Sequence, residues 1–331
     1  MKLTLKSFVV LVLAVCLIVG MVACQESSPE SPVVSDSSSA EESVADNTSS
    51  GETLKIGVTL MNFNTEFSIG LKDYMTAKAE GMPDVELNVI DAGGDAAKQV
   101  QQIESFIAQG VDAIIMQPQE QEACSPAIDK AKAAGIPIIN VNSLTVSEPD
   151  AYVGSNDTES AEIALTYIAE RLEGKGNVLM MHGHAGQTAE LKRTEGAMNV
   201  LAKNPEMQLL DEQTANWDRA EAMTLMENWI QAYGDQINAV FCQNDEMAMG
   251  ALNALIQTGS KENVVVVGID AIADALQSVK DGDLDATVYQ DCKGQAEGAL
   301  VAAYKLAKGE NVEKEILIPF ILVTQDNVDD F

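Results

Sequence analysis

Histidine and cysteine are scarce in this sequence, and their scarcity excludes several kinds of chemistry. Only 2 of the 331 residues are histidine and 5 are cysteine, and the cysteines show no CxxC spacing. Zinc sites, Cys–His nucleophiles and Ser–His–Asp triads all require such residues in clusters. We therefore expect no metal ion, no cofactor, no disulfide framework and no enzyme activity.

Two short motifs suggest functional sites but are better explained as loops. His182 and His184 are too few for a metal site without a third histidine. Gly93-Gly94-Asp95 opens a helix, but no phosphate-binding GxxxxGK[ST] or GxGxxG pattern follows a strand. An exported enzyme on an α/β scaffold remains an alternative, although no set of catalytic residues supports it.

Basic residues are outnumbered by acidic ones, which limits the possible partners. The chain has 20 lysines and arginines against 51 aspartates and glutamates, and its net charge is −31. Binding to DNA, RNA or anionic lipid requires a basic patch that neutralises phosphates. We therefore expect no nucleic-acid partner.

The first 24 residues have the pattern of an export signal. Lys2 and Lys6 precede an apolar run over residues 8–19, which is shorter than the ~20 residues of a membrane span. The following MVAC is similar to a bacterial lipobox, with Met21 in place of the usual leucine, and it predicts lipidation of Cys24. Two or three acyl chains would anchor the exported protein to the outer face of the cell membrane or in the periplasm. A retained anchor helix is the alternative.

The amino-terminal part of the chain divides into two segments of different composition. Residues 1–23 are the predicted lipoprotein signal peptide. Residues 24–52 begin with the lipidated cysteine and are rich in serine and glutamate, without aromatic residues. Such a segment cannot bury enough apolar surface to offset the entropy lost on ordering, so we interpret it as a disordered tether.

From Leu54 onward, short apolar runs alternate with amphipathic helical stretches. Continuous apolar strands separated by helices are typical of an α/β fold with parallel sheets covered on both faces. Two similar doubly wound halves follow each other and meet near residues 153–156. The predicted helices are 67–79, 96–108, 123–133, 158–171, 189–202, 218–232, 246–257 and 294–307.

Polar side chains collect just past the predicted strands, which is where open α/β sheets bind ligands. Amides, carboxylates, a guanidinium and an aromatic face together suit a compact polyhydroxylated ligand. The alternative is that some of these residues only cap helices, and we expect Asn244 to face the cleft and Asp245 to be the cap. The set comprises Asn140, Asn142, Gln187, Arg193, Trp217, Asn244, Asp245, Asp270, Gln290 and Asp291.

Three long segments carry a resemblance to a known family. TANWDRAEAMTLMENWI, CQNDEMAMGALNAL and VVGIDAIADALQSVKDGDLDATVYQD closely resemble the galactose/glucose-binding receptors and their relatives, the type I sugar-binding receptors of ABC importers. The resemblance implies two Rossmann-like lobes joined by a hinge of three crossovers, which close on one sugar. The lobes would comprise residues 53–155 plus 292–318 and residues 156–291 plus 319–331.

The resemblance also implies a set of site residues. Position by position, Phe67 and Trp217 form the aromatic sandwich. The hydrogen-bonding residues are Asn142, Arg193, Asn244, Asp270 and Gln290, and we add Gln187 to the predicted site.

At four positions the sequence differs from the galactose/glucose receptors, and these differences affect which ligand is expected. Met61 and Thr65 replace a tyrosine and an aspartate, while Gln187 and Ala189 replace a histidine and an aspartate. Two carboxylates that would bind sugar hydroxyls are therefore missing, although a sugar ligand is still expected. The family's calcium loop is replaced by the short LEGKGN, so we expect no structural calcium.

The resemblance implies a receptor that performs no reaction. It would capture a monosaccharide, either a galactose- or glucose-like hexose or a ribose-like pentose, and deliver it to ABC permease subunits with their ATPase. The alternative is a sensor that presents its closed form to a chemoreceptor or a sensor kinase. A cytoplasmic sugar-responsive repressor is disfavoured by the export signal and by the lack of a basic DNA-binding module.

Overall fold

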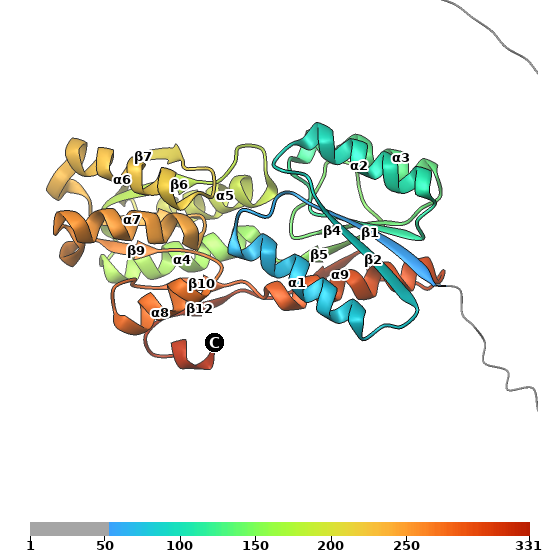
Figure 1. Cartoon of the computed structure of the whole chain (residues 1–331). Coiled ribbons are helices and arrows are strands. Elements are labelled where there is room, and N and C mark those ends of the chain that lie inside the picture. Colours follow the sequence, from blue (N-terminus) through green and yellow to red (C-terminus); the bar gives the residue numbers. More distant parts are fainter. Residues whose placement is uncertain (1–52) are drawn as a thin grey trace, which may run out of the picture. The chain divides into compact units, whose positions relative to one another are not determined.

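The computed structural model describes residues 53–331, in which strands and helices alternate as predicted (Figure 1). The predicted signal peptide, the lipidation of Cys24 and the tether fall on residues 1–52 and lie outside the described residues. Within residues 53–331, no helix combines the length and the apolar character needed to cross a bilayer.

Six parallel strands form the first sheet, in the order β11-β5-β4-β3-β1-β2. The middle strands β3, β4 and β5 are buried along their whole length, as expected for a parallel sheet covered on both faces. The strands are β1 (Leu54–Leu60), β2 (Val85–Asp91), β3 (Ala113–Met116), β4 (Ile138–Val141), β5 (Ala151–Gly154) and β11 (Glu315–Leu317).

Two helices cover each face of the first sheet. Helices α1 (Glu66–Glu80) and α9 (Cys292–Ala307) pack together on one face, and α2 (Ala96–Gln109) and α3 (Gln121–Ala133) pack together on the other (Figure 1). Successive side chains of a strand point to opposite faces, so Ile115 joins the core under α1 and α9 while its neighbour Ile114 joins the core under α2 and α3.

The second sheet has four parallel strands in the order β7-β6-β8-β9. Isolated parallel bridges from Val267 and Asp270 place β10 beside the end of β9, and β10 pairs with β12 in antiparallel orientation. The strands are β6 (Lys175–His182), β7 (Glu206–Thr214), β8 (Ala239–Cys242), β9 (Val265–Val267), β10 (Thr287–Tyr289) and β12 (Ile321–Val323).

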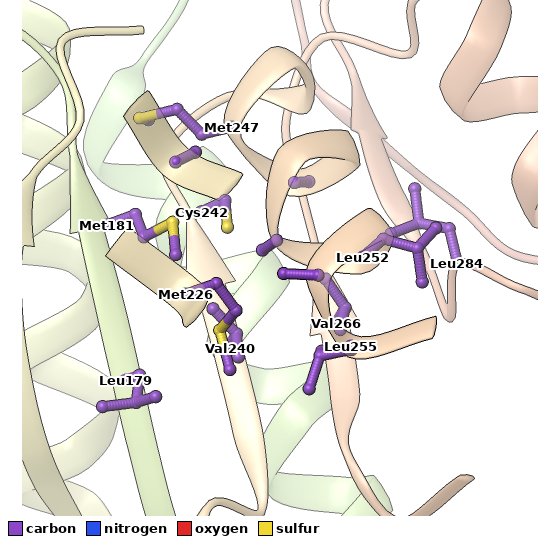
Figure 2. Packing of buried hydrophobic residues seen from close by; sticks show 14 of the residues in the cluster. Leu179, Met181, Met226, Val240, Cys242, Met247, Leu252, Leu255, Val266 and Leu284 are labelled. Carbon is purple, nitrogen blue, oxygen red and sulfur yellow. The ribbon is translucent and has the colours of Figure 1, made fainter. Parts of the chain in front are cut away.

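Helices cover both faces of the second sheet as well. The pair α4 (Asp157–Arg171) and α5 (Thr188–Lys203) covers one face, and the pair α6 (Arg219–Tyr233) and α7 (Asp245–Thr258) covers the other. Figure 2 shows the core of the second pair, in which side chains of both helices meet those of β6 and β8. Cys242 belongs to this core, and burial raises the pKa of its thiol well above the usual value, which makes the thiol unreactive.

The chain passes between the two sheets three times. It crosses after β5 into α4, after β10 into α9, and after β11 into β12. The predicted fold class, two doubly wound α/β halves joined by three crossovers, is confirmed. Helix α8 (Ala273–Asp281) was not predicted; at 9 residues it is shorter than an average helix. Within residues 53–331, short 3-10 helices span Gly234–Gln236, Lys261–Asn263 and Val328–Asp330.

Close packing of α6 and α7 leads to a first prediction. A Cβ atom on Gly250 would lie 2.2 Å from the carbonyl oxygen of Arg219, so Gly250→Ala must push the helices apart. We expect a loss of about 1–3 kcal/mol in the free energy of unfolding, measured by chemical denaturation.

The matched control is Gly81→Ala. Gly81 has a φ of −83°, and a Cβ atom on this residue would lie 3.4 Å from its nearest neighbour, the carbonyl oxygen of Lys78. We expect a change within about 0.5 kcal/mol for this variant. Equal effects of the two substitutions would show that the helix contact is not tightly packed.

Candidate functional site

All eight predicted site residues line one pocket at the carboxyl ends of the strands. Phe67 comes from α1, while Gln187 and Arg193 come from the start of α5. The others follow strands or precede helices in the loops of both sheets, which is where ligands bind in open α/β folds. The full lining is Met61, Asn62, Thr65, Phe67, Ser68, Gln117, Asn142, Ser143, Gln187, Ala189, Arg193, Trp217, Asn244, Asp270 and Gln290.

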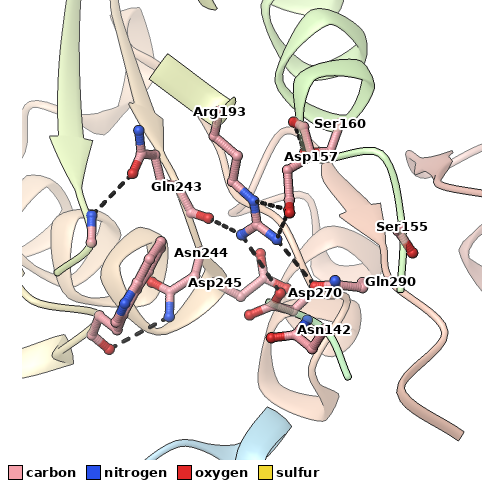
Figure 3. Close-up of polar contacts among 12 residues, drawn as sticks. Asn142, Ser155, Asp157, Ser160, Arg193, Gln243, Asn244, Asp245, Asp270 and Gln290 are labelled. Carbon is pink, nitrogen blue, oxygen red and sulfur yellow. Dashed lines mark hydrogen bonds and ion pairs between the residues drawn. The ribbon is translucent and has the colours of Figure 1, made fainter. Parts of the chain in front are cut away.

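The guanidinium of Arg193 is at the centre of a buried polar network (Figure 3). Its Nε and Nη2 contact the same carboxylate oxygen of Asp157 at 3.0 Å and 2.9 Å. Its Nη2 also donates to Oε1 of Gln290 at 3.1 Å, and its Nη1 donates to the carbonyl oxygen of Gln243. Nearly all of its hydrogen-bond donors are therefore used by the protein, and Asp157 balances its charge.

Two further carboxylates lie beside this network. Asp270 lines the pocket, and its nearest cationic atom is Nη1 of Arg193 at 4.0 Å. Asp245 lies deeper, where it accepts hydrogen bonds from the Thr287 hydroxyl at 2.7 Å and 2.9 Å and from the backbone N–H of Ile272 at 3.1 Å. Burial raises the pKa of Asp245 to about 7 and the pKa of Asp270 well above its usual range, although Arg193 opposes both shifts.

The assignment of Asn244 as ligand residue and Asp245 as helix cap is wrong in its second half. Asn244 itself caps α7, because its Oδ1 accepts from the backbone N–H of Met247 at 3.0 Å. The same side chain also lines the pocket, with its Nδ2 3.5 Å from the carbonyl oxygen of Trp217. Asp245 instead holds the loops beneath the pocket.

The indole of Trp217 is fixed from two sides. Its Nε1 donates to Oε1 of Gln187 at 2.6 Å, and a Cβ atom on Gly183 would lie 1.8 Å from the ring, so only glycine fits there. Gln187 in turn contacts the sulfur of Met61 at 3.8 Å through its Nε2. Contacts within the protein therefore fix the position of the ring.

Several site residues have backbone conformations that L-residues rarely adopt. The φ angles are 64° at Asn142, 62° at Trp217 and 129° at Asp270. Such conformations cost on the order of 1–3 kcal/mol each and are found mainly where function requires a side chain to point in a particular direction. All three side chains point into the same pocket.

The polar residues found at the strand ends do not match the pocket lining completely. Some lining residues were missed, and some strand-end residues do not line the pocket. Asn62 and Gln117 both line it, and Gln117 directly follows β3, so the strand-end rule could have found it. Its Nε2 donates to Oδ1 of Asn142 at 3.0 Å. Asn140 bonds to Thr145 at 2.7 Å instead, and Asp291 caps α9.

No group of three or more His, Cys, Asp or Glu side chains within residues 53–331 is arranged to hold a metal ion. His182 accordingly has other partners. Its Nε2 lies 3.0 Å from Glu212, and its Nδ1 lies 3.1 Å from the Thr194 hydroxyl. His182 is the last residue of β6, so its interpretation as a loop residue is wrong, while its contacts are those of a structural residue.

Comparisons with known proteins agree with this geometry. The profile of the periplasmic binding protein domain matches residues 56–311. A provisionally named rhizopine-binding protein of Rhizobium meliloti is 41% identical over 284 residues, which is 83% of this chain and 92% of its own. An ABC transporter solute binding protein of Bacillus halodurans with bound myo-inositol is 38% identical, with a TM-score of 0.82 over 86% of this chain and 98% of its own.

A third comparison concerns a different biological setting. The fructose-binding periplasmic domain of a hybrid two-component system is 29% identical, with a TM-score of 0.79 over 84% of this chain and 92% of its own. None of these three proteins is named for galactose or glucose. The predicted likeness to receptors for those two sugars is therefore only loose.

The raised pKa of Asp245 predicts a pH effect on stability. In the unfolded chain this carboxyl should titrate near the reference value of about 3.9, whereas in the folded protein its pKa is about 7. Between about pH 4 and pH 7 the folded state therefore holds a proton that the unfolded state has released. The contribution of Asp245 to the free energy of unfolding falls as pH rises through this range.

We expect the melting temperature to fall more steeply between pH 5 and pH 8 in the wild type than in Asp245→Asn, which has no carboxyl to titrate. Thermal unfolding followed by circular dichroism at a series of pH values measures both slopes. Identical slopes in the two proteins would mean that Asp245 does not titrate in this range.

Proposed function

This chain belongs to the periplasmic binding protein family, and from that premise we propose that it is an exported receptor for one monosaccharide or cyclic polyol. The eight predicted residues bind this ligand, and no reaction takes place on it. The receptor closes around the ligand and delivers it to the permease subunits of an ABC importer, which is driven by its ATPase.

One observation carries this proposal: a partly buried acceptor and a buried donor in the same pocket lack hydrogen-bond partners among residues 53–331. The carboxylate of Asp270 accepts no hydrogen bond from the described chain, and Nε2 of Gln290 donates none. An unpaired buried polar group costs about 1–3 kcal/mol. Hydroxyl groups both donate and accept, so a ligand with neighbouring hydroxyls satisfies both side chains.

The aromatic and charged groups narrow the ligand class further. Phe67 and Trp217 can cover the apolar C–H faces of a ring, which leaves the hydroxyls at its edge for Asn142, Asn244 and Asp270. Arg193 is already neutralised by Asp157, so the pocket offers no spare positive charge to an anion. A neutral ring with several hydroxyl groups fits these conditions.

Delivery to a transporter requires that the two lobes move. We propose that residues 53–155 plus 292–318 and residues 156–291 plus 319–331 move as the two bodies about the three crossovers. Closure on the ligand distinguishes loaded from empty receptor, because only the closed form combines contacts from both lobes. The similarity to a fructose-binding domain of a two-component system supports signalling to a sensor kinase or chemoreceptor as a second candidate function.

The role of Asp270 gives a direct test. We expect Asp270→Asn to raise the Kd for the ligand at least tenfold, because the amide replaces one acceptor oxygen with an N–H donor and leaves a polar group of the complex unpaired, which costs about 1–3 kcal/mol. Calorimetric titration with myo-inositol, D-ribose and D-glucose first identifies which of them the wild type binds and then compares the variant.

The matched control for this experiment is Asp274→Asn on α8. Its side chain is 60% exposed and lies outside the pocket, so its Kd should equal that of the wild type. An unchanged Kd for Asp270→Asn would remove this carboxylate from the binding site.

Anchoring at Cys24 is a separate part of the proposal. We expect Cys24→Ala to release the exported protein from the membrane fraction into the soluble fraction, since no acyl chain can then be attached. Cys16→Ala, within the apolar run of the signal peptide, is the control and should leave the protein with the membranes. Fractionation followed by immunoblotting distinguishes the two, and retention of Cys24→Ala at the membrane would argue against lipidation.

A further inference from the structure

The hydroxyl of Thr188 connects the two lobes. Thr188 is the first residue of α5, which covers the second sheet, and it is buried. Its Oγ1 accepts from the backbone N–H of Leu144 at 2.8 Å and from Nε2 of Gln121 at 2.9 Å. It also lies 3.2 Å from the carbonyl oxygen of Leu144, to which it can donate, and 3.2 Å from the Ser143 hydroxyl. All three partner residues belong to the first lobe.

These contacts use the full capacity of one hydroxyl. A threonine side chain has a single O–H donor and two acceptor lone pairs, and Leu144 and Gln121 together occupy all three. A backbone contact reinforces the connection, because the N–H of Gln121 donates to the carbonyl oxygen of Gly186 at 3.2 Å. The connection is therefore polar, directional and possible only when the lobes are together.

A second connection joins the lobes at another edge of the pocket. Oε1 of Glu66, at the start of α1, accepts from the backbone N–H of Ala273 at 3.1 Å. Ala273 is the first residue of α8, and no side chain of its own N-cap residue, Ile272, bonds to it. Glu66 thus supplies the acceptor that α8 lacks within its own lobe.

Only Ser143, at 3.2 Å from the Thr188 hydroxyl, belongs both to these connections and to the pocket lining. Thr188, Gln121, Leu144 and Glu66 are absent from the pocket lining, although Gln187 and Ala189 on either side of Thr188 belong to it. The connections can therefore form whether or not a ligand is bound. A contact made only in the closed form raises the population of that form, and apparent affinity rises in proportion to the binding-competent fraction.

We propose that the Thr188 hydroxyl is a latch that holds the cleft closed and thereby sets ligand affinity without touching the ligand. This inference rests on the proposed function, because it assumes that the lobes open and close. Thr188 is a positioning residue in this scheme, and the more exposed Glu66–Ala273 hydrogen bond is a second contact of the same kind.

The test measures the distance between the lobes in protein without ligand. Spin labels at Gln101→Cys on α2 and Glu227→Cys on α6 report this distance by pulsed electron resonance. We expect a population at the short, closed distance in the protein with Thr188, and loss of that population in Thr188→Val, which keeps the shape of the side chain but not the hydroxyl. Thr188→Ser, which keeps the hydroxyl, should restore it.

A matched control separates the latch from a general effect of the substitution. Thr76→Val on α1 removes an exposed hydroxyl that bonds only within its own helix, to the carbonyl oxygen of Lys72 at 2.7 Å. Its distance distribution should equal that of the parent protein. Identical distributions for Thr188→Val and its parent would overturn the latch, and so would a parent protein that shows only the open distance.

Titration with myo-inositol provides the second readout. We expect Thr188→Val to raise the Kd about tenfold through faster dissociation, since one or two net hydrogen bonds of the closed form are lost. An unchanged Kd would overturn the link between latch and affinity. Failure of the parent protein to bind myo-inositol, D-ribose or D-glucose would contradict the proposed function instead, while the distance measurement would still decide on the latch.

Discussion

The burial of the Arg193 guanidinium is the constraint on which the rest of the site depends. A buried charge is tolerated only when it is paired and its hydrogen bonds are satisfied. Asp157 neutralises Arg193 from the start of α4, and the Gln243 carbonyl and Gln290 satisfy its remaining N–H groups. Arg193 therefore connects α5 to three other places: Asp157 at the first crossover, Gln243 at the end of β8 and Gln290 at the second crossover. One side chain thus holds together the base of the pocket and two of the crossovers between the sheets.

This pairing determines what the pocket can hold. Asp157 neutralises the charge of Arg193. The Asp270 side chain therefore lines the pocket without a close cationic partner, since Nη1 of Arg193 lies 4.0 Å away. Burial raises the pKa of Asp270 and of Asp245 below it, and the charge of Asp245 adds to the shift at Asp270. A ligand that donates hydrogen bonds relieves the unpaired acceptor, whereas an anion adds to the negative charge. Trp217, held by Gln187 and Gly183, supplies the apolar surface against which a ring can lie.

The sequence predicts the fold and the members of the site better than their individual roles. Strand ends in both halves indicated seven of the eight predicted residues that line the pocket, because parallel strands end at one edge of a sheet and place their following side chains together. The eighth, Phe67, came from the family resemblance. The role of Asp245 beneath the pocket could not be foreseen, since it depends on Thr287 and Ile272, which approach from later in the chain. The pairing of Asp157 with Arg193 likewise depends on a contact between elements that no local pattern encodes.

Selection by charge is the central claim, and a panel of matched neutral and anionic compounds tests it most directly. The thermal shift of the protein is measured with D-glucose and D-glucuronate, with D-ribose and ribose 5-phosphate, and with myo-inositol and its monophosphate. We predict that at least one neutral compound raises the melting temperature in a concentration-dependent way and that its anionic counterpart does not. A shift produced by the anionic compounds alone would contradict a site in which Asp157 has already neutralised Arg193.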